Sequence, residues 1–435
     1  MDLQSLPGFR DFYPEECSVR NRLFTLWRAA AESYGFEPYD GPPLEPLDLY
    51  RKKSGDEIVG QLYHFVDKGE REVALRPEMT PTLARMICAH GRSLRKPIKW
   101  YSIPQVFRYE RQQKGRLREH FQFNCDIFGE AGVGADAELV ALAVDTLCRL
   151  GLGPQDFVVR VSDRRLLLLM LERIGVREAQ LPEVLLIVDK ITREPRPIIV
   201  KKLEACLSSA SAAAQVVGLF DIKDLSGIEE RFQGDHVISE RLLEMQRFFG
   251  ILEAMNLGEF ARFDLAIVRG LLYYTGIVYE AFDRQGDFRA IFGGGRYDRL
   301  TEAVGGLEMP AAGFGMGDVV LTELLKMRGK LPAGQAGLDV FLVAVDETLR
   351  TRAVLPLARQ LRQAGLSVEY AFEQESVSKQ FKHAGQRKAR FSVVAGPDEW
   401  RRQSVKVKDM KTGTETEVKA EQLEGYLKKG VERIA

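Results

Sequence analysis

The feature that most constrains the fold is a basic hairpin predicted at residues 106–129. Two apolar, strand-like stretches flank a loop that holds five cations and two acids. These charged residues are Arg108, Arg111, Lys114, Arg116 and Arg118, with Glu110 and Glu119. A loop with this excess of positive charge attracts anions. The hairpin therefore suits a site that meets phosphate.

The second strand of this hairpin, residues 121–128, alternates between apolar and polar side chains. Successive side chains of a strand point to opposite faces, so Gln122, Asn124 and Asp126 share one face. Solvent is one explanation for a polar face. A small polar substrate beside an anion is the other, and the pattern alone leaves both open.

Composition bounds the class of protein. The 435 residues suffice for two or three domains, and Lys plus Arg and Asp plus Glu both total 62. A neutral molecule has no overall preference for polyanions, so DNA is not an expected partner and any RNA contact must be local. The five cysteines and five histidines are scattered without a CxxC pair. They predict reduced thiols and no protein-ligated metal.

Targeting and membrane-spanning patterns bear on where the protein is expected to act. The first residues lack a signal-peptide pattern, and no apolar run approaches the roughly 20 residues of a membrane span. We therefore expect a cytoplasmic protein without a membrane partner.

Along the first half, periodicity predicts a helix at residues 14–34, strands at 58–67 and 71–76, and a helix from Pro81 to about residue 89. Thr80 is the predicted N-cap of that helix, and Glu78 lies at the strand-to-helix junction. A helix at 135–150 and a strand at 157–161 follow. The sequence then becomes helical over about 163–260, which indicates a helical insertion without a catalytic signature.

The next segment, residues 263–282, returns to strand character and contains Arg269, Tyr273 and Tyr274. Glycines 293–295 permit close approach of backbone to a ligand or another strand, and glycines at 313, 315 and 317 lead into a helix at 318–327. Neither GxGxxG nor GxxxxGK[ST] is present, which excludes the Rossmann and P-loop modes of nucleotide binding.

A linker at 331–337 precedes strands that alternate with helices, the signature of a small α/β domain. Residues 376–411 contain ten Lys or Arg against three Asp or Glu. This excess indicates either a binding surface for RNA or a solvated helix face.

Five motifs together resemble the histidyl-tRNA synthetase family of class II aminoacyl-tRNA synthetases. They are LPGFRDFYPEE (6–16), LRPEMTP (75–81), VFRYERQQKGRLREHFQ (106–122), VRGLLYYTGIVYE (268–280) and GGGRYDRL (293–300). The resemblance implies a catalytic α+β domain at 1–330, with an antiparallel sheet flanked by helices and the insertion at about 163–260. It also implies an α/β anticodon-binding domain at 338–435 and a homodimer, with Pro42 near its interface.

The resemblance assigns two arginines to the chemistry and others to substrates. Arg108 would hold the α-phosphate of ATP, Arg269 would orient the histidine carboxylate as it attacks phosphorus, and Glu110 would face the adenine. Residues assigned to histidine are Glu78, Thr80 and Gln122 at the amino group, with Asp126, Tyr273 and Tyr274 at the imidazole. Those assigned to the tRNA acceptor end are Gln113, Arg116 and Arg118. The implied activity joins L-histidine to tRNA(His) with ATP, and Mg²⁺ is bound through the phosphates of ATP.

Two positions depart from the family pattern. Leu272 stands where the family commonly has Asp, and Val320 aligns with the arginine that contacts the terminal phosphates of ATP. Arg116 or Arg296 could replace that charge. The alternative function is a catalytically silent regulatory subunit of ATP phosphoribosyltransferase, which keeps the histidine pocket but typically lacks the anticodon-binding domain.

Overall fold

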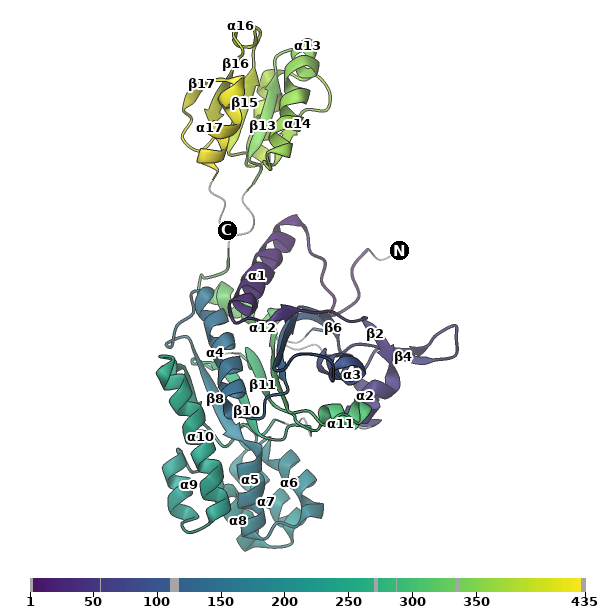
Figure 1. Ribbon diagram of the computed structural model, residues 1–435, viewed down its shortest axis with the longest axis vertical. Coiled ribbons are helices and arrows are strands. Elements are labelled where there is room, and N and C mark those ends of the chain that lie inside the picture. The colour runs from purple at the N-terminus through teal and green to yellow at the C-terminus, as the bar shows by residue number, and fades with distance from the viewer. Residues whose placement is uncertain are drawn as a thin grey trace. The chain divides into compact units, whose positions relative to one another are not determined.

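A computed structural model of the chain describes residues 3–54, 56–109, 117–269, 273–286, 288–332 and 337–431. These residues form two compact units, Met1–Pro332 and Ala333–Ala435. Each unit has its own central sheet and its own buried core (Figure 1).

A nine-stranded sheet forms the centre of the first unit. Its strands are β1 (Glu37–Pro38), β5 (Ile98–Ser102), β6 (Gln105–Phe107), β7 (Glu119–Phe128), β8 (Phe157–Asp163), β9 (Ala261–Phe263), β10 (Ile277–Asp283), β11 (Phe292–Arg296) and β12 (Ala311–Gly317). They follow the order β1-β5-β7-β12-β11-β10-β8-β9, and β6 pairs with β7. The inner pairings are antiparallel, while β1 with β5 and β8 with β9 are parallel. The predicted antiparallel sheet is therefore confirmed, with a parallel pair at each edge.

Strand β7 shows the predicted alternation. Phe123 and Cys125 are fully buried, and the ring of Phe123 stacks at 5.4 Å on Trp27. Asn124 and Asp126 project from the opposite face and are only 3% and 2% exposed. The polar face of β7 is therefore inside the protein, and exposure to solvent does not explain it.

Helices cover both faces of this sheet. They are α1 (Pro14–Ser33), α2 (Leu47–Ser54), α3 (Thr80–His90), α4 (Val133–Arg149), α11 (Leu300–Gly305) and α12 (Asp318–Met327). Helix α1 begins with Pro14 in its first turn and is followed by Gly35 at φ +73°, as the sequence predicts. Buried residues of α1 and α4 pack against the apolar face of β7, which leaves the other face for a site.

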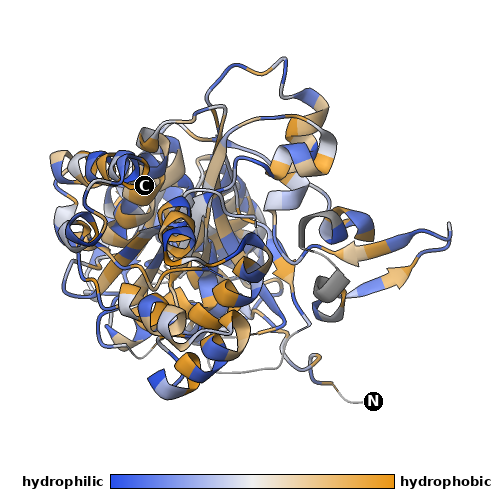
Figure 2. Ribbon diagram, turned by 90° about the horizontal axis from the view of Figure 1, so that it is seen from below, coloured by the Kyte–Doolittle hydropathy of each residue, from blue (hydrophilic) through white to orange (hydrophobic). Residues whose placement is uncertain are grey.

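The helical insertion is also confirmed. Between β8 and β9 lie α5 (Arg164–Ile174), α6 (Leu181–Val188), α7 (Arg196–Leu207), α8 (Ala210–Leu219), α9 (Leu225–Arg231) and α10 (His236–Ala254). Their turns alternate between apolar and polar colours in Figure 2, as expected for helices that bury one face. Among the residues that the structure describes, none of the helices has the length and apolar character needed to span a bilayer.

A small sheet beside α2 differs in part from the prediction. It contains β2 (Leu44–Pro46), β3 (His64–Val66) and β4 (Glu72–Leu75) in the order β2-β4-β3. The predicted strand at 58–67 is shorter, because Asp56–Gln61 forms a 3-10 helix. The predicted N-cap was also wrong: Met79 is the N-cap of α3, and Thr80 is its first helical residue.

The second unit is the predicted small α/β domain, and its five-stranded sheet is mixed. Its strands are β13 (Val340–Ala344), β14 (Val368–Tyr370), β15 (Phe391–Ala395), β16 (Ser404–Asp409) and β17 (Glu415–Lys419), in the order β14-β13-β15-β16-β17. The first three are mutually parallel, and the last two are antiparallel additions. Its helices are α13 (Glu347–Leu349), α14 (Leu355–Gln363), α15 (Val377–Gln386), α16 (Pro397–Arg401) and α17 (Leu423–Gly430), with a π-helical turn at Arg350–Val354.

The basic excess at residues 376–411 is largely paired within this unit. Seven of its ten cations form ion pairs with acids, several of which lie outside that window. The cations are Lys379, Arg387, Arg390, Arg401, Arg402, Lys406 and Lys408. A count of charges along the sequence therefore overstated the free positive charge of this surface.

Candidate active site

A row of residues crosses the polar face of the central sheet. The pairing register places Asn124 of β7 opposite Gly315 of β12, Gly315 opposite Gly293 of β11, Gly293 opposite Glu280 of β10, and Glu280 opposite Arg160 of β8. Directly paired residues point to the same side of a sheet. The row thus places polar side chains at both ends and two glycines between them.

The two glycines leave room for side chains that lie across the sheet. A Cβ on Gly293 would stand 2.0 Å from Nη1 of Arg269, and a Cβ on Gly315 would stand 2.1 Å from Nε2 of Gln122. Both distances are far below a van der Waals contact. The glycine runs therefore belong to strands β11 and β12, where the absent side chains allow Arg269 and Gln122 to lie over the sheet.

A cavity of about 60 Å³ opens above these glycines. One water needs only about 10–15 Å³ of such space, so the cavity admits a small ligand group. Its lining includes seven residues that the sequence assigned to substrates: Glu78, Thr80, Arg108, Gln122, Arg269, Tyr273 and Tyr274. The fold thus brings together assigned residues from three separate sequence motifs.

Two polar atoms of the lining lack a partner among the described residues. Oε1 of Gln122 and Nδ2 of Asn124 are buried and accept or donate no hydrogen bond there. An unsatisfied buried polar atom costs about 1–3 kcal/mol. A polar ligand in the cavity would remove that cost.

Asp126 lies just beneath this cavity. Tyr297, which lines the cavity, donates a hydrogen bond from its hydroxyl to the Asp126 carboxylate. Burial, and then the charge of Asp126, raise the pKa of Tyr297 well above its usual value. Tyr297 therefore stays protonated at neutral pH, and its hydroxyl connects the cavity wall to the Asp126 carboxylate.

Two further tyrosines stand beside Tyr297. The ring centroids of Tyr273 and Tyr274 are 4.6 Å apart, and the ring of Tyr297 lies 5.9 Å from that of Tyr273. Burial is the main cause that raises the pKa of both Tyr273 and Tyr274. The wall of the cavity is thus aromatic and carries neutral hydroxyl groups.

Arg269 occupies a strained backbone position, and its guanidinium carbon lies 5.3 Å from the centre of the Tyr274 ring. Its φ is +47°, which is unusual for a residue with a side chain and costs about 1–3 kcal/mol. Among the described residues, Nη1 donates one hydrogen bond of 3.3 Å to the Tyr279 carbonyl, and Nε lies 3.6 Å from the Glu280 carboxylate. The guanidinium therefore keeps donors available for a ligand.

Arg108 enters the cavity from the other side. It follows β6, and its backbone N–H donates to the Arg118 carbonyl across the hairpin. Its Nε donates to the Pro77 carbonyl at 2.9 Å, beside Glu78 at the start of α3. The hairpin and the strand-to-helix junction thus fix one another.

The remaining predicted residues lie elsewhere. Arg118 does not line the cavity; its guanidinium lies 4.6 Å from the Tyr109 ring and donates to the Pro7 carbonyl. Glu110, Gln113 and Arg116, as well as Leu272, lie outside the described residues.

An arginine that sequence reasoning missed lies between the hairpin and α12. Arg10 donates from Nε to Glu119 at 2.7 Å and from Nη1 to Asp318 at 2.9 Å, and Asp318 accepts from the backbone N–H of Phe121. Both acids are nearly fully buried. The position of Arg10 inside the motif LPGFRDFYPEE was the available signal. Val320, two residues after Asp318, packs in the apolar core.

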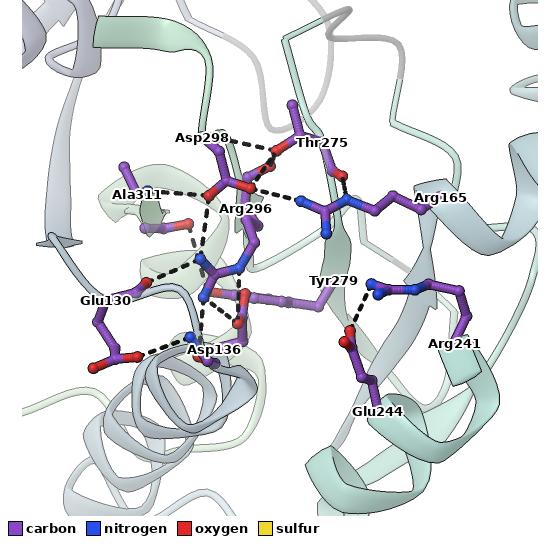
Figure 3. Close-up of polar contacts among 12 residues, drawn as sticks. Glu130, Asp136, Arg165, Arg241, Glu244, Thr275, Tyr279, Arg296, Asp298 and Ala311 are labelled. Carbon is purple, nitrogen blue, oxygen red and sulfur yellow. Dashed lines mark hydrogen bonds and ion pairs between the residues drawn. The ribbon is translucent and has the colours of Figure 1, made fainter. Parts of the chain in front are cut away.

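Arg296 does not supply the missing phosphate charge (Figure 3). Its five N–H groups make five hydrogen bonds: two to the Asp136 carboxylate, one to Asp298, and one each to the carbonyls of Glu130 and Gly132. The residue is 4% exposed. The suggestion that Arg296 contacts ATP was therefore wrong, because the protein itself uses every donor.

The Arg296 network instead supports the cavity wall. Asp298 also accepts from the hydroxyl of Thr275, and the N–H of Thr275 donates to the Arg296 carbonyl (Figure 3). Tyr297 lies between Arg296 and Asp298, and Tyr274 directly precedes Thr275. The network therefore fixes two of the tyrosines that line the cavity.

Tyr297 and Asn124 are the polar lining residues that the sequence assignment left out. Tyr297 belongs to the motif GGGRYDRL, and Asn124 lies between two assigned residues on the same face of β7. Strand periodicity was thus sufficient to find Asn124, whereas the contact between Tyr297 and Asp126 joins distant segments.

Comparison with known proteins decides the family. The family described as Histidyl-tRNA synthetase matches residues 8–318, and the Anticodon binding domain matches residues 339–430. The chain belongs to the histidyl-tRNA synthetase family.

Relatives of this synthetase align over nearly its whole length. A histidine–tRNA ligase of Opitutus terrae is 45% identical over 428 residues, covering 98% of both chains. A chloroplastic/mitochondrial histidine–tRNA ligase of Arabidopsis thaliana is 40% identical over 424 residues, covering 98% of this chain and 86% of the relative. The crystal structure of histidyl-tRNA synthetase from Nostoc sp. has a TM-score of 0.83 at 26% identity, covering 99% of this chain and 100% of that one.

Proposed function

We propose that the protein is a histidine–tRNA ligase: it activates L-histidine with ATP and transfers the histidyl group to the 3′ end of tRNA(His). Relatives with that name are 38–45% identical to the chain. The anticodon-binding domain match favours this function over the regulatory subunit, which typically lacks that domain. Aminoacyl-tRNA synthetases use ATP, and here the ATP carries Mg²⁺ through its phosphates.

The single observation that carries the proposal is the small cavity with its unpaired polar atoms. Gln122 and Asn124 offer an acceptor and a donor that have no partner in the part of the chain that the structure describes, and Glu78 and Thr80 also line the cavity. In the proposal Gln122, Glu78 and Thr80 bind the α-amino group of histidine. Tyr273 and Tyr274 bind the imidazole, together with Asp126, which acts through the hydroxyl of Tyr297.

Two arginines perform the activation step. Arg108 holds the α-phosphate, and Arg269 orients the histidine carboxylate and stabilises the charge that develops during attack. The carboxylate oxygen bonds to the α-phosphorus, the bond to the bridging oxygen breaks, and pyrophosphate leaves with the electron pair. No covalent enzyme intermediate is needed.

The transfer step forms an ester. A hydroxyl oxygen of the terminal ribose attacks the histidyl carbonyl carbon, the bond to the phosphate oxygen breaks, and AMP leaves with the electron pair. The hydroxyl proton is released. Gln113, Arg116 and Arg118 in the hairpin meet the acceptor end, and Glu110 faces the adenine of ATP.

The same proposal assigns the domains. Residues 1–330 form the catalytic domain with its insertion at about 163–260, and residues 338–435 bind the anticodon. The protein acts as a cytoplasmic homodimer. Within the described residues, no group of three or more His, Cys, Asp or Glu side chains gathers as a metal site.

Histidine-dependent ATP–pyrophosphate exchange tests this function. We expect exchange with histidine and none with the other amino acids as controls. That result would also show that the activity does not need an arginine at Val320. Histidine binding without exchange would instead place the regulatory function first.

A further inference from the structure

Arg10 holds together three segments that lie far apart in the sequence. Its Nε donates to Glu119, the first residue of β7, at 2.7 Å, and its Nη1 donates to Asp318, the first residue of α12, at 2.9 Å. The side chains of the two acids are only 1% and 3% exposed. The N-terminal segment thus links the base of the hairpin to the helix that follows β12.

This cluster of Arg10, Glu119 and Asp318 is a poor way to stabilise a fold. Two largely buried acids share one guanidinium, and burial raises the pKa of Asp318 more than the charge of Arg10 lowers it. Buried ion pairs often stabilise a protein less than apolar side chains of similar volume would, and in some proteins they instead specify one geometry. The geometry in question here is that of the hairpin base.

The contacts of Glu119 lead to Arg108. Glu119 pairs with Phe107 in the ladder between β6 and β7, and its Oε2 accepts a hydrogen bond of 2.9 Å from Nε2 of Gln105, the first residue of β6. Arg108 directly follows Phe107 and lines the small cavity. A shift of the Glu119 side chain would therefore move the strand that carries Arg108.

The contacts of Asp318 fix the neighbouring strand in the same frame. Its Oδ1 accepts a hydrogen bond of 2.9 Å from the backbone N–H of Phe121, while its Oδ2 accepts from Arg10. Asp318 directly follows Gly317, the last residue of β12, which pairs with Gln122. Among the described residues, the cluster itself does not line the small cavity. Any effect that it has on that cavity must pass through other residues.

We infer that Arg10 is a positioning residue for ATP: through Glu119 it fixes the hairpin base, so that Arg108 meets the α-phosphate in one orientation. The inference rests on the proposed function and deepens it, because it names a residue that acts on ATP binding through Arg108. Gln122, by contrast, is fixed by the ladder between β7 and β12. Histidine binding should therefore depend much less on Arg10.

The other end of α12 offers a matched control. There Arg328 also lies between two largely buried carboxylates, with Nη2 at 2.8 Å from Asp283 and Nε at 3.5 Å from Asp156. These contacts join the helix to the end of β10 and to the residue before β8. Arg328→Gln therefore removes the same charge from a similar cluster that joins different strands.

ATP–pyrophosphate exchange at varied ATP and histidine concentrations tests the inference. A charge-assisted hydrogen bond supports about a tenfold to hundredfold effect. We expect Arg10→Gln to raise the KM for ATP at least about tenfold and to change the KM for histidine much less. Arg10→Lys should recover part of this loss, because it keeps the charge but lacks the planar fork that meets both acids. Arg328→Gln should change neither KM, even where it destabilises the protein, because KM does not depend on the fraction of folded enzyme.

Asp318→Asn separates positioning from simple attraction between charges. It keeps an oxygen for the Phe121 N–H and leaves Arg10 paired with Glu119, so no buried acid loses its cation. If Arg10 acted on ATP only through its charge, removal of the neighbouring acid would lower the KM for ATP. If Arg10 positions the hairpin, its weaker contact with a neutral side chain should raise this KM about threefold or more.

The outcomes are distinct. A KM for ATP that rises in Arg10→Gln and in Asp318→Asn, but not in Arg328→Gln, would establish the role. If Arg10→Gln does not fold, Arg10→Lys and Asp318→Asn carry the same comparison. A KM for ATP that is unchanged in the Arg10 variants, that does not rise in Asp318→Asn, or that rises only as much as the KM for histidine would overturn the inference. Absence of exchange in the natural protein would instead overturn the proposed function.

Discussion

Two arginines of the first unit, Arg296 and Arg269, are both largely enclosed but serve opposite purposes. Arg296 uses all five of its N–H groups within the protein, against Asp136, Asp298 and two carbonyls. Arg269 makes one hydrogen bond of 3.3 Å among the described residues and sits at φ +47°. An arginine whose N–H groups are all hydrogen-bonded within the protein stabilises the fold. An arginine with unused N–H groups in a strained position is available for a ligand.

The same difference separates the polar groups around them. In the small cavity, which Arg269 also lines, Oε1 of Gln122 and Nδ2 of Asn124 have no hydrogen-bond partner among the residues that the structure describes. The Arg296 side chain is not part of the lining of this cavity, and it joins the start of α4 to the end of β11 (Figure 3). Residue type alone does not reveal this division, because both arginines lie in motifs of the family.

The largest expected effect is on stability, from Arg296→Met. This change leaves the buried Asp136 carboxylate without its cation, which costs about 3–5 kcal/mol of the free energy of unfolding. The double variant Arg296→Met with Asp136→Leu should recover part of the loss, since no buried charge remains. Urea unfolding measures both.

Arg165→Gln is the control for that experiment. Arg165 donates to the other oxygen of Asp298 but is 43% exposed, so its loss should cost less than about 1 kcal/mol. If Arg296→Met lowered the free energy of unfolding no more than Arg165→Gln does, the fully hydrogen-bonded Arg296 would not have the structural role that separates it from Arg269.

The next effect is on catalysis, from Arg269→Ala. If Arg269 acts mainly on the transition state, adenylation should fall by about 10² to 10³ with little change in histidine affinity. Unfolding by urea should change much less than for Arg296→Met, because Arg269 has few partners and a strained backbone. A loss expressed only as weaker histidine binding would refute the catalytic role.

Local patterns predicted the elements of this fold well. Proline and glycine signals predicted α1, and strand alternation predicted the two faces of β7. The interruption of strand character predicted the insertion. These features depend on neighbouring residues in the sequence. The strand predicted at 58–67 failed at its start because a 3-10 helix forms there.

Contacts between distant segments could not be predicted. Arg10 reaches Asp318 across 308 positions, and Arg296 reaches Asp136 across 160. The pairing of Tyr297 with Asp126 is equally remote. The sequence located most of the residues that line the cavity through family motifs, but whether each charge is satisfied or open depends on the packed structure.

The smallest expected effect is on the pH dependence of stability. It comes from His120, a buried group at the edge of the site that stays uncharged. His120 lies on the same face of β7 as Gln122, and burial, with smaller contributions from Arg108 and Arg10, lowers its pKa to about 3. The usual pKa near 6.5 applies to the unfolded chain. As pH falls below 6.5 the unfolded chain therefore binds a proton that the folded chain does not, and stability is lost towards pH 3.

Between pH 7 and pH 5 this loss amounts to about 2 kcal/mol. His120→Gln should remove it, so the free energy of unfolding in urea should fall by about 2 kcal/mol less over this range than in the natural protein. His90→Gln, at an exposed histidine, is the matched control for the substitution itself. Equal slopes for the natural protein and His120→Gln would mean that His120 is charged in the folded state, with its imidazolium beside Arg108. In that case burial, Arg108 and Arg10 together would not keep the imidazole neutral, and this edge of the site would carry an additional positive charge.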